Sequence, residues 1–264
     1  MKRREFITLL SGAAIAGPQA AFAQPSSKVY RLGTLSPGAP FDDKSPNGAI
    51  LVRVLAERGY TLGQNLTFDA RGAVGQIGKL CRRSGCHRPG RLARPGGNIT
   101  DISDVATTLS TKRLSLLQQL NPKLRRVAML WNKDDLGMSL RYEASAKVAQ
   151  SIGITVQPLG VREPDDFNEA FAAMNREPPD AILMVWDSLT TLNRKRVFDF
   201  AAERKLPAIY EYDFLVRDGG LMSYGPDLKE SFERAGDLAA RIFKGARPAD
   251  LPFEQPTRYP IVIN

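Results

Sequence analysis

The sequence has little of what most metal and catalytic sites need. Its 264 residues include two cysteines and one histidine, Cys81, Cys86 and His87, which lie within seven positions. A haem attachment site needs Cys-x-x-Cys-His, and a structural zinc site needs a second ligand pair, so neither pattern is met. A disulfide closing a short loop, a metal-binding pair and an irregular segment all stay open for this stretch. Without a second histidine, acid–base catalysis would fall to carboxylates.

Long apolar runs and common enzyme motifs are also missing. Beyond residue 23 no segment reads as a transmembrane helix, which takes about 20 mostly apolar residues. Neither a Gly-x-Ser-x-Gly nor a Gly-x-x-x-x-Gly-Lys-Ser/Thr pattern occurs. The run from Gly72 to Gly78 is Gly-x-x-Gly-x-x-Gly, which departs from the dinucleotide-binding pattern. We therefore expect no enzyme activity, no catalytic residue, no cofactor and no metal site.

The amino terminus has the order of an export signal. Met1 to Arg4 is positive, Ile7 to Ala16 is short and mostly apolar, and Ala21-Phe22-Ala23 fits a signal peptidase site. The run Arg3-Arg4-Glu5-Phe6-Ile7 also fits the twin-arginine pattern. The sequence therefore predicts a signal peptide over residues 1–23, a mature chain from Gln24 and a periplasmic location.

The net charge of +9 and the pI of 9.7 suggest a nucleic-acid partner, but the charges are unevenly placed. The signal accounts for two of them. Residues 76–98 hold six basic residues and no acid, so the rest of the chain has a net charge of only +1. A nucleic-acid footprint would spread over a folded face, so we expect no nucleic-acid binding.

The second half of the chain alternates between two patterns. Apolar runs begin at Val127, Ile154, Ala181 and Ala208, each 27 residues after the last. Continuous apolar runs are typical of strands buried on both faces of a parallel sheet. The stretches between them have helical period, as in Phe167, Ala170, Phe171 and Met174. This alternation predicts an α/β fold with doubly wound parallel sheets.

The first half begins in the same way and then stops. Strands are expected over Val29–Ser36 and Asn65–Asp69, with a helix over Ile50–Arg58 between them. From Gly72 to Gly97 there is no apolar period, so the first lobe is too small to cover both faces of a sheet. The expected divisions are a signal at 1–23, a partial first α/β lobe at 24–72, an irregular basic segment at 73–97, a second α/β lobe at 98–246 and an extended C-terminal segment at 247–264.

Several pieces resemble one known family in order along the chain. They are residues 1–7, 31–38 (RLGTLSPG), 59–65 (GYTLGQN), 94–100 (RPGGNIT), 207–211 (PAIYE), 219–225 (GGLMSYG) and 245–264. These pieces look like the substrate-binding proteins of ABC transporters, closest to the periplasmic group linked to tryptophan, tyrosine or related uptake. The resemblance implies two α/β lobes joined by crossing strands, which close over an amino acid or related small molecule. It also implies a monomer that delivers its solute to an inner-membrane ABC permease.

The chain departs from this pattern in two places. Family members continue the first lobe with further βα units after Asp69, and they usually run on past Asn264 with a closing helix. A frameshift with an internal deletion near residues 73–94 would explain the basic, cysteine-bearing stretch. A short first lobe is expected to impair ligand binding, because small-molecule sites enclose most of the ligand surface.

Candidate ligand-binding residues lie at the carboxyl ends of the expected strands, where open α/β sheets bind ligands. Serines there can bond a carboxylate, acids can pair with an ammonium, and aromatic rings can stack on an apolar side chain. The candidates are Ser36, Trp131, Asn132, Asp187, Ser188, Tyr210, Glu211 and Tyr224. Asp187 can also serve only as a helix cap, and Trp131 can equally be a core residue.

Two other functions remain open at this point. Binding-protein folds also serve as ligand-sensing modules for a periplasmic partner protein. An enzyme on a similar fold is a weaker alternative, because the motifs that would carry the chemistry are missing.

Overall fold

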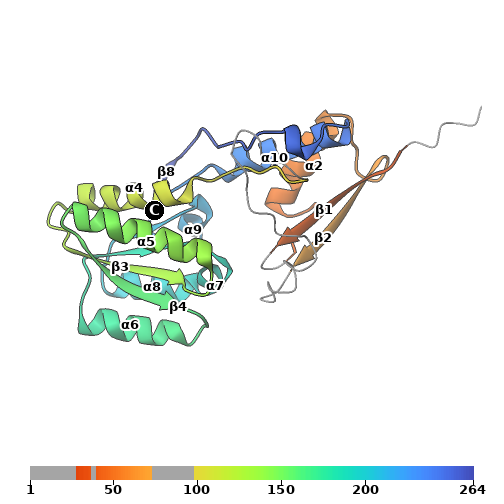
Figure 1. The fold of residues 1–264 in the computed structure, drawn as a ribbon. Helices are drawn as coiled ribbons and strands as arrows, with labels where there is room; N and C mark the ends of the chain where they lie inside the picture. Colours follow the sequence, from red (N-terminus) through yellow and green to blue (C-terminus); the bar gives the residue numbers. More distant parts are fainter. Residues whose placement is uncertain (1–27, 37–39, 73–97) are drawn as a thin grey trace, which may run out of the picture.

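The computed structural model describes residues 28–36, 40–72 and 98–264. The expected signal peptide, Cys81, Cys86 and His87 lie outside the described residues. The described chain forms two lobes of α/β structure, joined by extended segments (Figure 1). The predicted fold class is confirmed, with a small first lobe and a larger second one.

The second lobe is built on a six-stranded sheet with the strand order β4-β3-β5-β6-β7-β8. Its strands are β3 (Arg126–Asn132), β4 (Thr155–Val161), β5 (Ala181–Met184), β6 (Ala208–Tyr210), β7 (Met222–Tyr224) and β8 (Ile261–Ile263). The apolar runs at Val127, Ile154, Ala181 and Ala208 all form strands, as predicted. Neighbouring strands are parallel except at the edge, where β8 runs antiparallel to β7.

Helices cover both faces of this sheet, which explains why its strands are apolar throughout. Figure 1 shows α4 and α5 on one side of the strands and α6 on the other. The helices of the lobe are α4 (Ala106–Leu120), α5 (Leu136–Ser151), α6 (Asp166–Arg176), α7 (Ser188–Leu192), α8 (Arg194–Glu203) and α9 (Asp213–Arg217). Leu114 and Leu117 of α4 belong to one core cluster, whereas Phe167 of α6 and Val197 of α8 belong to the other.

The first lobe has a two-stranded parallel sheet of β1 (Tyr30–Ser36) and β2 (Leu66–Gly72). Two helices, α2 (Pro46–Glu57) and α10 (Leu228–Phe243), complete the described part of this lobe. Its core cluster joins Leu55, Tyr60 and Leu66 to Ala240. A sheet of two strands is marginally stable by itself, so the described part of this lobe depends on the packing of α2 and α10.

The position of α10 differs from the expected boundary at residue 246. Its apolar stripe was assigned to the second lobe because the helix follows β7 directly in sequence. Instead α10 packs along α2, and Gly236 allows the close approach. A Cβ added at Gly236 would lie 2.8 Å from Cγ1 of Val54. Ion pairs to α10 from Arg53 of α2 and from Arg58, which follows α2, flank the contact.

The chain passes between the lobes through residues 98–105, 225–227 and 244–260. Two of these crossing segments are hydrogen-bonded side by side. The amide of Ser103 donates to the carbonyl of Glu254 at 2.9 Å, and the amide of Glu254 donates to the carbonyl of Asp101 at 2.9 Å. Residues 244–260 form the returning segment, which leads from α10 to β8. The 3-10 turn η1 (Pro248–Asp250) lies on it. Residues 247–264 are therefore a connection and an edge strand.

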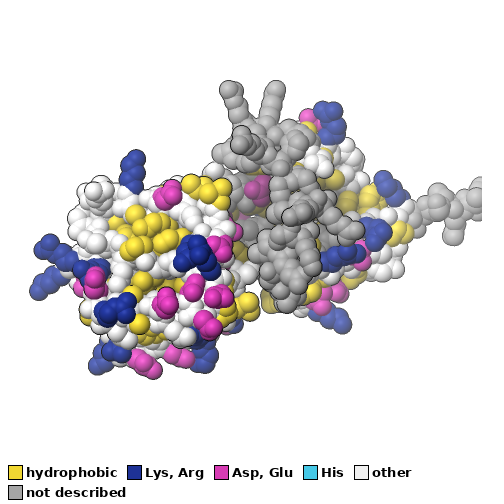
Figure 2. Space-filling model, turned by 60° about the horizontal axis from the view of Figure 1, so that its bottom comes forward, with side chains coloured by type: hydrophobic (Ala, Val, Ile, Leu, Met, Phe, Trp, Pro, Cys, Tyr) yellow, Lys and Arg dark blue, Asp and Glu magenta, His cyan; other side chains and the backbone are white. Residues whose placement is uncertain are grey.

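In the described part of the chain, no helix is long and apolar enough to cross a membrane. On the face that Figure 2 shows, the basic side chains of the second lobe are scattered, several acidic side chains lie close together, and there is no continuous basic patch.

Glu230, in the first turn of α10, ties this helix to the returning segment. Its carboxylate accepts hydrogen bonds from the amide and hydroxyl of Thr257, from the amide of Arg258 and from the guanidinium of Arg234. Burial disfavours the charged form, but the hydrogen bonds from Thr257, Arg234 and Arg258 outweigh it and lower the pKa of Glu230 to about 2.

Glu230→Gln is expected to lower the free energy of unfolding at pH 7 by about 1–2 kcal/mol, because charge-assisted hydrogen bonds are lost. The folded pKa is below the unfolded one, so the contribution of Glu230 is present above roughly pH 4.3 and is lost as the pH falls toward 2. The difference in free energy of unfolding between the wild-type protein and Glu230→Gln should therefore become smaller as the pH is lowered. Denaturant unfolding across this pH range measures it.

Glu233→Gln, one turn along α10 and more exposed, is the matched control and should have a smaller effect. A loss of unfolding free energy in Glu230→Gln that stays constant from pH 7 to pH 3 would contradict a stabilising role of the ionised Glu230 carboxylate.

Candidate functional site

A cavity of about 500 Å³ lies at the junction of the two lobes. It is bounded by the crossing segment that enters α4, by Tyr212 after β6 and by the apolar face of α10. Its lining residues are Thr100, Asp101, Ile102, Asp104, Tyr212, Pro226, Leu228, Ser231, Phe232, Ala235, Leu238, Ala239 and Ile242. A mostly apolar wall with a few polar groups, in a volume of roughly 300–1,000 Å³, is typical of small-molecule sites.

Asp104 supplies a negative charge to this cavity. One carboxylate oxygen, Oδ1, accepts the amide of Ala106 at 3.1 Å and so fixes the start of α4. The other, Oδ2, has only long contacts, 3.4 Å to Nη2 of Arg141 and 3.4 Å to the hydroxyl of Tyr212. The Asp104 side chain is 35% exposed. The carboxylate is thus fixed at Oδ1, while its contacts at Oδ2 are long and the side chain is partly exposed.

The hydroxyl of Tyr212 stays protonated at neutral pH. Burial raises the pKa of Tyr212, and the carboxylates of Glu211 and Asp104 raise it further. The hydroxyl can therefore donate to Asp104. The ring packs edge-on against Trp186, with ring centres 5.1 Å apart, and stacks on Phe214 at 6.1 Å. These contacts make an aromatic wall at the end of β5 and β6.

A buried ion network lies directly behind Asp104. Glu211 follows β6 and is 1% exposed, and so is its partner Arg113 on α4. Nη1 of Arg113 is 3.0 Å from Oε1 of Glu211, and Nη1 of Arg141 on α5 is 3.0 Å from Oε2. Burial lowers the pKa of Arg113, while Glu211 opposes that effect. Arg141 thus links the network to Asp104, with two cations and two carboxylates in balance.

Gly225 allows the ends of β6 and β7 to approach each other beside this network. A Cβ at this position would lie 1.8 Å from the backbone oxygen of Glu211, so only glycine fits between the ends of β6 and β7. Nε of Arg113 donates to the carbonyl of Tyr224 at 2.6 Å. Arg113 therefore links the end of β7, through the carbonyl of Tyr224, to the side chain of Glu211 after β6.

Val105 has a strained backbone next to Asp104. Its φ of +46° places a β-branched residue in the left-handed region. Such a conformation costs roughly 1–3 kcal/mol and persists where neighbouring contacts hold it. The contacts of Asp104 with Ala106, Arg141 and Tyr212 hold this turn, at the point where the crossing segment becomes α4.

None of the residues predicted from the strand ends is among the described residues that line this cavity. Glu211 and Tyr224 belong to the ion network behind it. Asp187 caps α7 in a capping box with Thr190, which matches its alternative as a cap, and Ser188 begins that helix. These residues stay predictions as ligand contacts.

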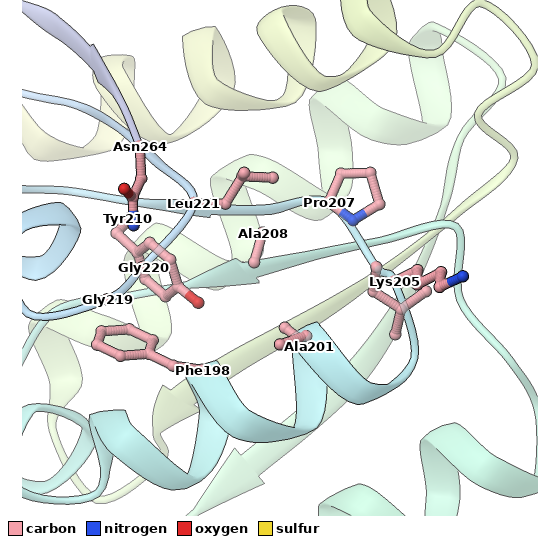
Figure 3. A pocket seen from close by; sticks show the side chains of 12 residues that line it. Phe198, Ala201, Lys205, Pro207, Ala208, Tyr210, Gly219, Gly220, Leu221 and Asn264 are labelled. Carbon is pink, nitrogen blue, oxygen red and sulfur yellow. The ribbon is translucent and has the colours of Figure 1, made fainter.

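The other predicted residues lie at separate places. Ser36 ends β1 in the first lobe. Trp131 is 7% exposed and stacks on Tyr142, with ring centres 4.0 Å apart, while Asn132 accepts the amide of Asp134. Tyr210 is fully buried, and its ring lies against Phe198 of α8 (Figure 3).

Sequence reasoning missed Arg113, Arg141, Asp104 and Tyr212. A signal existed for Arg113, which lies four residues before Leu117 on the inward stripe of its helix. A basic residue on an apolar stripe indicates a buried partner. Asp104 gave no such signal, because it lies in a segment without periodicity.

Comparison with known proteins identifies the family of this chain. The family model of ABC transporter substrate-binding proteins matches residues 89–264. The chain belongs to this family. The tyrosine-binding protein of Clostridioides difficile is 25% identical over 173 residues, which are 66% of this chain and 49% of that protein. The chain thus spans about half the length of this curated relative.

Solved structures share the fold of this family member. A conserved domain protein from Vibrio cholerae has a TM-score of 0.77 at 18% identity, covering 89% of this chain and 92% of the other. The ABC domain of a Streptococcus pneumoniae protein in complex with L-Trp has a TM-score of 0.71 at 19% identity, with the same coverages. At these identities the likeness shows the fold alone.

Arg113→Met is expected to lower the free energy of unfolding by about 3–5 kcal/mol, because it leaves the buried charge of Glu211 with one partner fewer. Arg162→Met removes an ion pair whose two side chains are more than half exposed, and should cost less than about 1 kcal/mol. Denaturant unfolding compares the two. Equal effects would show that the buried network does not hold the lobe together.

Proposed function

We propose that this protein binds a small solute in the cavity between the crossing segment and α10. In this proposal the protein is exported to the periplasm and delivers the solute to an inner-membrane ABC permease as a monomer. The observation that carries the proposal is the partly exposed carboxylate of Asp104 at the end of a mostly apolar cavity, which Asp101 also lines. Membership in a substrate-binding family supports it.

The walls of the cavity indicate the class of solute. Phe232, Leu238 and Tyr212 would contact an apolar or aromatic body, and Asp104 would pair with an ammonium group. Arg113 and Arg141 bond to Glu211 at 3.0 Å, whereas Arg141 reaches Oδ2 of Asp104 only at 3.4 Å, so an ammonium group can compete for that oxygen. An aromatic amine, including an aromatic amino acid, therefore fits this cavity. The tyrosine-binding relative and the L-Trp complex support the same class.

The first lobe limits the expected affinity. Its described sheet has two strands, so it covers less of a solute than a full lobe would. Because affinity in such sites depends on enclosure, we expect weaker binding than in a protein with two complete lobes.

Thermal unfolding of purified residues 24–264 with L-tyrosine, L-tryptophan, tyramine and 3-(4-hydroxyphenyl)propanoate tests the proposal. A solute at ten times its Kd should raise Tm by roughly 3–5 °C. Tyramine should still bind, because it keeps the ammonium, and the propanoate should not. A melt that none of these solutes shifts would contradict the proposed function and support a chain impaired by its short first lobe.

Asp104→Asn should weaken binding of tyramine about 10- to 100-fold, because it removes the charge and keeps the cap on Ala106. Asp101→Asn is the matched control, since Asp101 lines the same cavity and its side chain bonds its own neighbour, Ile102. Calorimetric titration measures both. Equal losses of tyramine affinity in the two variants would contradict a specific role of Asp104.

A further inference from the structure

A second cavity lies at the opposite end of the strands of the six-stranded sheet. Its volume is about 330 Å³, at the lower end of the range for small-molecule sites. Residues 205–207 precede β6, which Ala208 begins, and residues 219–221 precede β7, so the cavity lies at the amino ends of these strands. Asp104 and the lobe junction lie at their carboxyl ends. The two cavities share no lining residue.

The inner wall of this cavity is apolar and buried. Phe198, Ala201 and Ala208 are buried and line it, whereas Lys205 and Leu221 are exposed at its rim. Among the described lining residues only Lys205 carries a charge, and Figure 3 shows its amine directed away from Tyr210. An uncharged molecule therefore suits the interior.

Tyr210 adds a buried hydroxyl group to the apolar wall, and the side-chain amide of Asn264 also lines the cavity. The residue is fully buried, and no described residue is within hydrogen-bond distance of its hydroxyl. Figure 3 shows the hydroxyl directed between Ala208 and Ala201, into the cavity. Buried hydroxyl groups are normally hydrogen-bonded, so an unpaired one at the inner end of a cavity points to a missing partner.

The orientation of the Tyr210 ring is fixed on both sides. Phe198 packs edge-on against it, with ring centres 4.9 Å apart. Gly220 lies on the other side, where a Cβ would come within 2.7 Å of Cε2 of the ring. The hydroxyl is thus held in one place, as a group that recognises a ligand must be.

We propose that this cavity is a second binding site, for a small uncharged aromatic molecule with one hydroxyl group, such as a phenol. The ring of the ligand would lie against Phe198, Ala201 and Ala208. Its oxygen would accept the hydrogen bond of the Tyr210 hydroxyl. The site is separate from the solute cavity and does not depend on the proposed function.

NMR titration of the ¹⁵N-labelled protein with phenol and with toluene tests this site, because the two probes have similar shape and differ in the hydroxyl. Phenol should perturb residues 205–208 and 219–221. Tyr210→Phe should weaken phenol binding about tenfold and leave toluene binding unchanged. Ala201→Leu, which fills the cavity, should abolish binding of both probes.

Asp104→Asn, in the other cavity, should leave phenol binding unchanged. Unaltered phenol affinity in Tyr210→Phe, perturbations confined to residues 100–104, or no phenol binding to the wild-type protein would each overturn the proposal. A crystal soaked in phenol that shows only water on the Tyr210 hydroxyl would do the same.

Discussion

The buried ion pair between Arg113 and Glu211 is the contact on which the larger lobe and its site depend. Both side chains are 1% exposed, so their charges are almost entirely removed from water. Such a pair is tolerated only when further hydrogen bonds satisfy the remaining donors and acceptors. Arg141 bonds the other oxygen of Glu211, and the carbonyl of Tyr224 accepts from Arg113. The network therefore connects α4, α5 and the ends of β6 and β7.

The same network determines where Asp104 lies. Arg141 contacts both Glu211 and Asp104, so the crossing segment is bonded to the core of the second lobe at the point where it lines the cavity. The strained turn at Val105 is held by these contacts. On the other side of the junction, Glu230 bonds α10 to the returning segment. The two walls of the cavity are thus fixed by carboxylates that are already hydrogen-bonded in the protein.

The fold was largely predictable because its strands are continuous apolar runs. The runs at Val127 and Ala181 are typical of strands buried on both faces, and they are β3 and β5. The partner of α10 was not predictable, because an amphipathic stripe shows which face is buried and not what covers it. Gly236, which meets Val54 of α2, carries that information only when the helix packing is known.

The site was less predictable for a related reason. A carboxylate at the end of a strand can bind a ligand or neutralise a cation of the protein, and the sequence does not show which. Glu211 meets two arginines from helices that are distant in sequence. Asp104 and Tyr212 reach the cavity through a crossing segment and a turn, neither of which has a sequence period. Tyr210 alternates with its neighbour along β6 and therefore faces away from the network.

Amide hydrogen exchange of the purified protein, with and without saturating tyramine, tests the central claim most directly. The account predicts that tyramine slows exchange in residues 100–105 and along α10, while the amides of β3, β5 and β6 are slow in both states. Protection by tyramine elsewhere, or none at all, would contradict the placement of the solute site. Exchange in β6 as fast as in β1 and β2 would contradict the role of the buried ion pair.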